Sequence, residues 1–312
     1  MKKISFVIPC YRSENTIRSV IAGIDKKVKE RPEYDYEIIT INDCSPDSTF
    51  SVLKELAKGN KKLKVINLAC NVGKHAAILA GYKFVNGKYV VNLDDDGQCP
   101  MEELWSLLLP LEQGHDMSMA RYSSKKQSML KNLGSRVNNM VSQIMLEKPK
   151  DLVFTNFIAR QLYICKAMAE YSNTFPYLEG LTLKITRDIV LVPMEEKERM
   201  GGVSGYTLKK SMQLLMNGLT AFSVKPLRMA SVMGVCIAMS GFIYGMVTII
   251  RKLLYPNIMV GYSSIIVAIM FCSGVIMMLL GIIGEYVGRI YISINRYSQY
   301  VIKETVNLNM DE

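Results

Sequence analysis

Two long stretches without charged side chains, 229–250 and 253–284, lie near the end of the chain and constrain its fold most strongly. Each is long enough to cross the ~30 Å hydrocarbon core of a bilayer, which takes about 20 apolar residues in a helix. Because only Arg251 and Lys252 separate them, we expect a hairpin of two transmembrane helices that leaves and returns on one side. A catalytic domain tethered in this way is expected to act on a substrate that lives in the membrane.

Basic residues flank the two stretches. They are Lys209, Lys210, Lys225 and Arg228 before the first, and Arg289, Arg296 and Lys303 after the second. The positive-inside bias therefore predicts a multi-pass protein of the inner (plasma) membrane, with the N-terminal domain and the C-terminus in the cytoplasm. The same charges would attract anionic head groups or a lipid phosphate. The formal net charge is +10, but no nucleic-acid-binding motif accompanies it, so nucleic acid is not an expected partner.

Apolar runs and segments of helical spacing alternate in the N-terminal part. The apolar runs are 4–9, 36–41, 63–68 and 88–93, and the helical segments are 14–28, 48–58, 74–86 and 102–113. This alternation predicts an α/β domain with a mostly parallel sheet and helices on both faces. Ligands of such sheets bind beyond the carboxyl ends of the strands. Polar clusters at 10–14, 42–47 and 94–98 follow three of the predicted strands and mark a candidate site.

Asp94 and Asp96 follow an apolar run, one residue apart. Two carboxylates in this arrangement can hold Mg²⁺ or Mn²⁺, which bridges phosphate oxygens and neutralises charge on a departing diphosphate. A solvated acidic turn is the alternative for such a pair taken by itself. Repulsion among three consecutive aspartates, with Asp95 between the two, favours a bound cation.

Several other segments extend the pattern, in this order: FVIPCYRSENTI (6–17), NDCSPDST (42–49), NVGK (71–74), DDDGQCP (94–100), RMGGVSGY (199–206), FSVKPLR (222–228) and GEYVGRIY (284–291). In order and spacing they resemble family 2 glycosyltransferases of the GT-A fold. More narrowly, they are similar to polyprenyl-phosphate sugar synthases, such as dolichol-phosphate mannose synthase and bacterial undecaprenyl-phosphate glucosyl- or aminoarabinosyltransferases. The resemblance covers nearly the whole chain.

The resemblance implies a role for each matching residue. It implies contacts to the nucleotide-sugar from Pro9, Tyr11, Glu14, Asn42, Asp43, Lys74, Asp95 and Gln98. It implies that Asp94 and Asp96 bind the metal and that Arg121 joins them in catalysis. It implies phosphate or acceptor contacts from Arg160, Arg199, Ser204, Tyr206, Lys225 and Arg228. Arginine suits phosphate because its planar fork donates two parallel hydrogen bonds.

Three departures from the family pattern stand out. Asn42 occupies a position where relatives usually carry aspartate, and Gly205 replaces a lysine before the loop tyrosine. An acidic residue before a Phe-Arg pair is also absent, so Arg160 is the counterpart of that arginine within 155–160. His75 and His115 have no partner at metal-ligand spacing, and we expect them in the core or on the surface.

The expected domains are a GT-A catalytic domain at 1–206, an amphipathic juxtamembrane helix at 207–228, two transmembrane helices within 229–290 (about 229–250 and 262–284) and a cytoplasmic tail at 291–312. The expected reaction transfers a sugar, with inversion, from an NDP-sugar to polyprenyl (undecaprenyl) phosphate. Such lipid-linked sugars serve the synthesis of cell-surface glycans. Alternatives are a transferase that extends a lipid-linked glycan and a catalytically degenerate membrane scaffold. Relatives also imply a homo-oligomer.

Overall fold

A computed structural model describes residues 2–122, 149, 152–173, 176–197, 225–255, 262–294 and 298–308. The chain forms two compact units. The first comprises Met1–Gly218 together with Arg296–Glu312, and the second comprises Leu219–Asn295.

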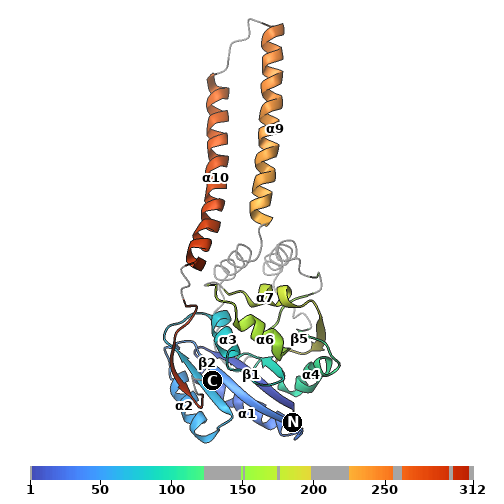
Figure 1. Cartoon of the computed structure of the whole chain (residues 1–312), viewed down its shortest axis with the longest axis vertical. Coiled ribbons are helices and arrows are strands. Elements are labelled where there is room, and N and C mark those ends of the chain that lie inside the picture. Colours follow the sequence, from blue (N-terminus) through green and yellow to red (C-terminus); the bar gives the residue numbers. More distant parts are fainter. Residues whose placement is uncertain are drawn as a thin grey trace. The chain divides into compact units, whose positions relative to one another are not determined.

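The first unit is built on a sheet whose described strands follow the order β7-β5-β6-β4-β1-β2-β3-β8 (Figure 1). The strands are β1 (Lys2–Cys10), β2 (Tyr34–Asn42), β3 (Leu63–Leu68), β4 (Tyr89–Asn92), β5 (Met117–Tyr122), β6 (Ile158–Gln161), β7 (Ile189–Met194) and β8 (Ile302–Val306). The central strands β4, β1, β2 and β3 are all parallel, whereas β6 and β8 run antiparallel to their neighbours. A mostly parallel α/β sheet is therefore confirmed.

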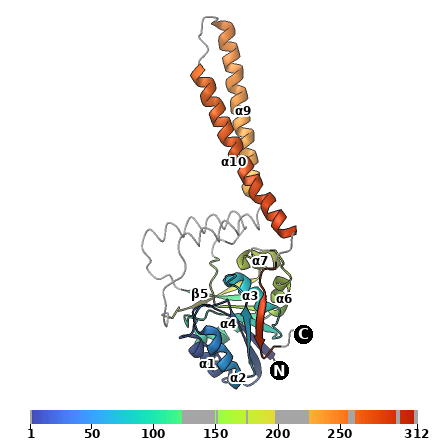
Figure 2. The ribbon, with the colours of Figure 1, turned by 90° about the vertical axis from the view of Figure 1, so that its left-hand side faces the viewer.

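Helices cover both faces of this sheet (Figure 2). They are α1 (Ile17–Val28), α2 (Thr49–Gly59), α3 (Lys74–Tyr82), α4 (Leu104–Glu112, after a 3₁₀ turn at Met101–Glu103), α6 (Leu162–Ala169) and α7 (Leu178–Ile185). On one face, Phe6 of β1 belongs to the same buried cluster as Ile24 of α1 and Leu107 of α4. On the other face α3 approaches so closely that a Cβ on Gly81 would lie 2.8 Å from Ile41 Cδ1.

The C-terminal segment corrects one expected boundary. Residues 291–312 are expected to form a tail, but β8 pairs antiparallel with β3 and belongs to the first unit. Asn307, which follows the strand, donates through Nδ2 to the carbonyls of Ala57 (2.8 Å) and Leu63 (2.9 Å). The segment thus closes an edge of the sheet that would otherwise expose unpaired backbone groups.

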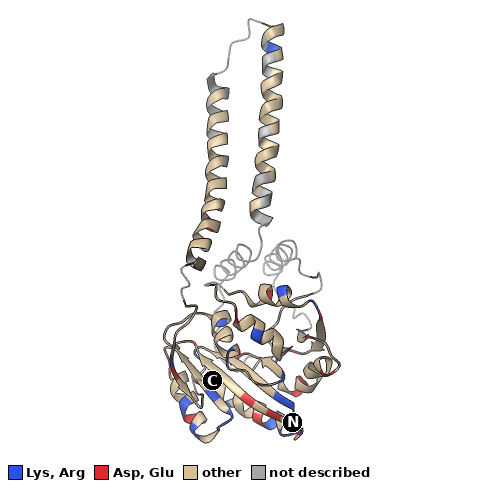
Figure 3. Cartoon of the chain, in the orientation of Figure 1, with Lys and Arg blue, Asp and Glu red and all other residues tan. Residues whose placement is uncertain are grey.

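The second unit is a pair of helices, α9 (Lys225–Leu254) and α10 (Tyr262–Ile294). Both helices are longer than the expected spans. The helix α9 extends past both ends of 229–250, and α10 extends past 284. Among the described residues, Phe271–Gly288 in α10 is long and apolar enough to cross a membrane, and α9 contains a shorter apolar stretch, Val232–Val247. Figure 3 shows charged residues scattered over the first unit, whereas α9 and α10 carry few where they are described. Of the two expected spans, the one in α10 meets this criterion among the described residues, and the span in α9 stays a prediction.

Candidate active site

The carboxyl ends of β2, β1 and β4 lie side by side, and the residues that follow them meet. Cys10 pairs with Asn42 in the sheet register, and Val7 pairs with Asn92. Just beyond β1, the Tyr11 amide donates to Asp95 Oδ2 at 3.0 Å, which joins two loops 84 residues apart in sequence. The predicted convergence of the polar clusters at this edge is therefore confirmed.

Each of the three consecutive aspartates has a different environment. Asp94 Oδ1 lies 2.5 Å from the Lys74 ammonium, and Asp96 Oδ1 accepts the Gln98 amide at 3.1 Å. Burial raises the pKa of Asp95 to about 6, although the Ser13 side chain and the Tyr11 amide oppose this shift. Asp95 is thus a structural link between loops, while Asp94 and Asp96 present oxygens at the strand end.

Asp94 and Asp96 supply the hard oxygen ligands that Mg²⁺ and Mn²⁺ prefer. Within the described part of the chain, no group of three His, Cys, Asp or Glu side chains is arranged to hold a metal ion. The pair therefore fits a cation that takes its remaining ligands from water and from phosphate oxygens. Such incomplete protein coordination is usual for Mg²⁺ at phosphate sites.

Asp43 organises the neighbouring loop. It is 3% exposed, and its carboxylate accepts the amides of Val72 (2.7 Å) and Gly73 (2.9 Å). Burial raises the pKa of Asp43 even though these two amides favour the charged form. By holding the turn before α3, Asp43 sets the position of Lys74.

The structure corrects the expectation for Asn42. This side chain is 2% exposed and donates to Asn67 Oδ1 at 2.8 Å within the sheet. Because Asn42 is the last residue of β2 and points at the adjacent strand, it does not line the site.

The remaining nucleotide candidates divide into buried and accessible residues. Pro9 is buried in β1, and Glu14 Oε2 accepts the Ser48 amide at 2.9 Å before α2. Tyr11 is 45% exposed beside Asp95 and is available to a planar base. Gln98 is joined to the segment after β7, because its carbonyl accepts the Lys197 amide at 3.1 Å.

Arg121 lies near the end of β5 and is exposed. In the register of the sheet, Asn92, Ile158 and Met119 are aligned. Arg121 lies two residues beyond Met119 and Asp94 lies two residues beyond Asn92, so both occupy the same edge of the sheet. Arg199, Ser204 and Tyr206 lie outside the described residues. Lys225 and Arg228 lie in the first turn of α9.

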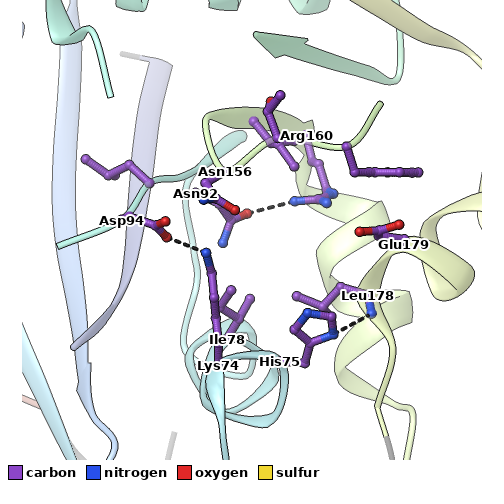
Figure 4. Close-up of a pocket in the computed structure, with 13 residues that line it drawn as sticks. Lys74, His75, Ile78, Asn92, Asp94, Asn156, Arg160, Leu178 and Glu179 are labelled. Atoms are coloured by element: carbon purple, nitrogen blue, oxygen red, sulfur yellow. Dashed lines mark hydrogen bonds and ion pairs between the residues drawn. The ribbon is translucent and has the colours of Figure 1, made fainter. Parts of the chain in front are cut away.

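Arg160 is the largest departure from expectation. It is expected to contact a phosphate or the acceptor, but it is 2% exposed, and its Nη1 donates to Tyr82 Oη (2.9 Å) and Asn92 Oδ1 (2.8 Å). It lines a cavity beside Asp94, between β4, α3 and α7 (Figure 4). The cavity is also lined by residues that the sequence motifs do not predict for the site, namely His75, Asn92, Asn156 and Glu179. The position of His75 next to Lys74, at the start of a predicted helix, is the one sequence feature that points to a place in the site.

Two family models match the chain. Residues 5–169 match the model described as Glycosyl transferase family 2, and residues 225–290 match the model described as GtrB C-terminal hairpin. The first match contains the strand ends and the aspartates described above. The second contains nearly all of α9 and α10.

Relatives align along almost the whole chain. A putative glycosyltransferase, CsbB of Bacillus subtilis (strain 168), is 33% identical over 99% of this chain and 93% of its own. An SfII prophage-derived bactoprenol glucosyl transferase of Shigella flexneri is 30% identical over 97% and 98%. An undecaprenyl-phosphate 4-deoxy-4-formamido-L-arabinose transferase of Photorhabdus laumondii is 28% identical over 99% and 96%.

A solved structure shares the fold of the first unit. It is glucosyl-3-phosphoglycerate synthase from Mycobacterium tuberculosis in complex with Mn²⁺, UDP-glucose and phosphoglyceric acid. The TM-score is 0.51 at 19% identity, over 70% of this chain and 79% of that one. At this identity the likeness concerns the fold.

Proposed function

This chain belongs to glycosyl transferase family 2, and we propose that it transfers a sugar from an NDP-sugar to polyprenyl phosphate, with inversion at the anomeric carbon. The product is a lipid-linked sugar with a single phosphate. Relatives named for bactoprenol and undecaprenyl phosphate, with coverage that extends through the hairpin, support this acceptor.

One observation carries the proposal. Asp94 and Asp96 follow the end of β4 at the edge where β1 and β2 also end, and Lys74 lies beside them. These groups suit a diphosphate that arrives with a divalent cation, because two carboxylates hold the cation and the ammonium meets phosphate oxygens. Mg²⁺ or Mn²⁺ bound there supplies charge neutralisation for the departing diphosphate.

The chain's other residues have supporting roles in this proposal. Tyr11 contacts the base, and Asp43 holds the 72–73 turn so that Lys74 faces Asp94. Arg121 and Arg199 meet phosphates. No strong general base is needed, since the acceptor is a phosphate monoester with a second pKa of about 6 and is largely dianionic at pH 7. Catalysis then depends mainly on placing two anionic groups together.

We propose that the hairpin anchors the protein in a membrane. An apolar stretch of the length found in α10 favours insertion into a bilayer. With basic residues on both flanks, we place the first unit at the cytoplasmic face of the inner membrane. Lys225 and Arg228 begin the hairpin, where the phosphate of a polyprenyl lipid emerges.

A transfer assay tests the proposal. Full-length protein in detergent receives polyprenyl phosphate, Mg²⁺ or Mn²⁺, and a panel of radiolabelled NDP-sugars. The expected result is one labelled lipid product from one donor class. Label transferred only to a preformed lipid-linked glycan would favour the chain-extending alternative. Normal nucleotide binding without transfer from any donor would favour the scaffold alternative.

A further inference from the structure

Two loops meet at the edge of the sheet where Tyr11 lies. The first loop, residues 11–16, joins β1 to α1, and the second loop, residues 43–48, joins β2 to α2 (Figure 1). Where the loops begin, the Asp43 amide donates to the Cys10 carbonyl at 3.0 Å. The way in which the two loops are held together therefore decides where Tyr11 lies in the site.

Both loops carry backbone strain. Arg12 has a φ of 58° and Cys44 a φ of 49°, in the left-handed region that residues other than glycine rarely adopt. Strained residues of this kind persist only where their surroundings fix them, and they gather at ligand-binding sites. Arg12 directly follows Tyr11, and its guanidinium carbon lies 5.6 Å from the centre of the Tyr11 ring. The contacts that fix Arg12 therefore also fix Tyr11.

Asp47 lies at the centre of those contacts. Its Oδ1 accepts the Ser45 hydroxyl at 2.5 Å, the Thr49 hydroxyl at 2.6 Å and the Thr49 amide at 3.1 Å. Its Oδ2 accepts the Glu14 amide of the first loop at 3.5 Å. One carboxylate thus joins both loops to the start of α2.

The two hydroxyl groups extend this support to the residues beside Tyr11. Because the Ser45 hydroxyl donates to Asp47, its oxygen accepts the Arg12 amide at 2.8 Å. In the same way the Thr49 hydroxyl donates to Asp47 and accepts the Ser13 amide at 2.9 Å. Three consecutive amides of the first loop are therefore bound by Asp47 or by a hydroxyl group that Asp47 orients.

The carboxylate of Asp47 is charged and has no acceptor capacity to spare. Burial acts to raise the pKa of Asp47, but the hydrogen bonds from Ser45, Thr49 and Glu14 outweigh it and the pKa is lowered. The group is therefore ionised at pH 7. Its two oxygens already accept four hydrogen bonds, about as many as a carboxylate can take. This arrangement favours action through its partners over direct contact with a ligand.

We infer that Asp47 is a positioning residue for the donor, which fixes the first loop so that Tyr11 contacts the nucleotide base. The inference rests on the proposed function and gives a role to a residue outside the expected contacts. It also assigns Glu14, which the resemblance places at the nucleotide, to the support of the loop. The Glu14 carboxylate accepts the Ser48 amide at 2.9 Å, so the two acidic side chains bind each other's loops.

Calorimetry on full-length protein in detergent, with Mn²⁺ present, tests this inference. The ligands are ADP, GDP, CDP, UDP and dTDP, of which the one that binds the wild type most tightly becomes the probe, and inorganic diphosphate, which lacks a base. Asp47→Ala should weaken the probe about tenfold, the scale of losing hydrogen bonds to a charged group, and leave inorganic diphosphate unchanged. Asp47→Asn keeps an oxygen for Ser45 and Thr49 and should lose less.

A double-mutant cycle shows whether Asp47 acts through Tyr11. Tyr11→Ala removes the proposed base contact, and Asp47→Ala in that background should weaken the probe little further, because the two residues act as one unit. Additive losses would overturn the inference. Equal weakening of the probe and of inorganic diphosphate by Asp47→Ala would also overturn it, since the effect would then not concern the base.

Asp25→Ala is the matched control. This carboxylate also joins two elements, because it accepts the Tyr36 hydroxyl at 2.9 Å and the Asn60 amide group at 3.3 Å. Its loss should lower the thermal midpoint and leave the affinity for the probe unchanged. A drop in affinity as large as that of Asp47→Ala would show a general effect of stability and overturn the positioning role.

Ser45→Ala covers the case in which Asp47→Ala does not fold, which the thermal midpoint reveals. This variant leaves Asp47 bound to Thr49 and removes the acceptor of the Arg12 amide. It should weaken the probe about threefold, as expected for one neutral hydrogen bond, without affecting inorganic diphosphate. Unchanged affinity for the probe would overturn the inference.

The outcomes separate this inference from the proposed function. If the affinity loss and its dependence on Tyr11 are found but no donor supports transfer to polyprenyl phosphate, the proposed function fails and the positioning role stands. If transfer occurs and Asp47→Ala binds the probe as the wild type does, the proposed function stands and the positioning role fails.

Discussion

The Nζ atom of Lys74 lies 2.5 Å from Oδ1 of Asp94. Lys74 begins α3 and Asp94 follows β4, so this ion pair joins the two elements that frame the site. Both side chains are mostly buried, which strengthens their attraction relative to a pair in water. The ammonium therefore neutralises a carboxylate that the proposed cation would also use.

Lys74→Met should raise the affinity for Mn²⁺ in the absence of nucleotide about fivefold, because the cation no longer competes with the ammonium. A factor of five corresponds to about 1 kcal/mol, the scale of a partly exposed ion pair. Calorimetric titration of Mn²⁺ measures it. Lys62→Met is the matched control, since Lys62 pairs with Asp35 at 2.8 Å on the surface. Equal Mn²⁺ affinities for the wild type and Lys74→Met would refute the competition between the Lys74 ammonium and the cation.

Asp96→Asn should reduce transfer at least a hundredfold, the scale of losing several kcal/mol of metal-assisted charge stabilisation. The fold should survive, because Asn can still accept the Gln98 amide through its own Oδ1. The initial rate of transfer at saturating Mg²⁺ measures the effect. Asp35→Asn provides a control with the same chemical change on the surface. Activity of Asp96→Asn near the wild-type level would remove the metal role.

Glu37→Gln should lower the free energy of unfolding by about 3 kcal/mol at pH 7, as expected when one partner of a buried ion pair is lost. The carboxylate is 2% exposed and accepts from Lys3 (2.7 Å), Ser5 (2.5 Å), Lys64 (2.9 Å) and the Asn86 amide (2.9 Å). Burial acts to raise the pKa of Glu37, but these hydrogen bonds outweigh it and the pKa is lowered.

The pH dependence of that loss gives a second check. A carboxyl whose folded pKa is below its unfolded value of about 4.3 contributes stability above that pH and loses it as pH falls through the folded pKa. The thermal unfolding midpoints of the wild type and Glu37→Gln, measured in detergent, should therefore differ most at pH 7 and become equal below about pH 4. Glu55→Gln, at an exposed pair with Arg18, should have little effect. A gap that is independent of pH would contradict this interpretation.

Gly87→Ala should destabilise the first unit by about 3 kcal/mol. A Cβ at this position would lie 2.6 Å from the Ser5 amide nitrogen and 2.8 Å from both Ile4 C and Lys3 O. All three atoms are backbone atoms of β1, so the strand itself would have to move. Gly23→Ala in α1 meets nothing within 4 Å and should stabilise by about 0.5–1 kcal/mol. Equal thermal midpoints for the two variants would contradict the close approach.

Much of the fold follows from hydrophobic pattern. The run 63–68 is the strand Leu63–Leu68, and the run 36–41 lies within Tyr34–Asn42. The strand Ile302–Val306 is not predicted by hydrophobic pattern. It is short, carries Lys303 and Glu304, and owes its conformation to pairing with β3. The hydrophobic pattern of residues 302–306 alone does not reveal that they pair with β3. The resemblance to family 2 glycosyltransferases, by contrast, is confirmed by the family model.

The candidate site follows from sequence where topology alone decides it. Parallel strands bring their ends together, and this places Asp94, Asp43 and Tyr11 at one edge. The direction in which a side chain points does not follow from strand topology. Asn42 points into the sheet and Arg160 into a buried cavity, since each is held by a partner distant in sequence, Asn67 for the first and Tyr82 for the second. Spacing along the chain carries no information on those partners.

Mass spectrometry of the lipid product tests the proposed reaction most directly. Polyprenyl phosphate is incubated with the wild-type protein, Mg²⁺ and the active NDP-sugar, and the lipid fraction is analysed with Asp96→Asn in parallel. We predict a lipid that is heavier by one sugar residue, keeps a single phosphate, and is formed by the wild type and not by Asp96→Asn. A product with two phosphates, or a polyprenyl phosphate that remains unmodified with every donor, would contradict sugar transfer to the lipid phosphate.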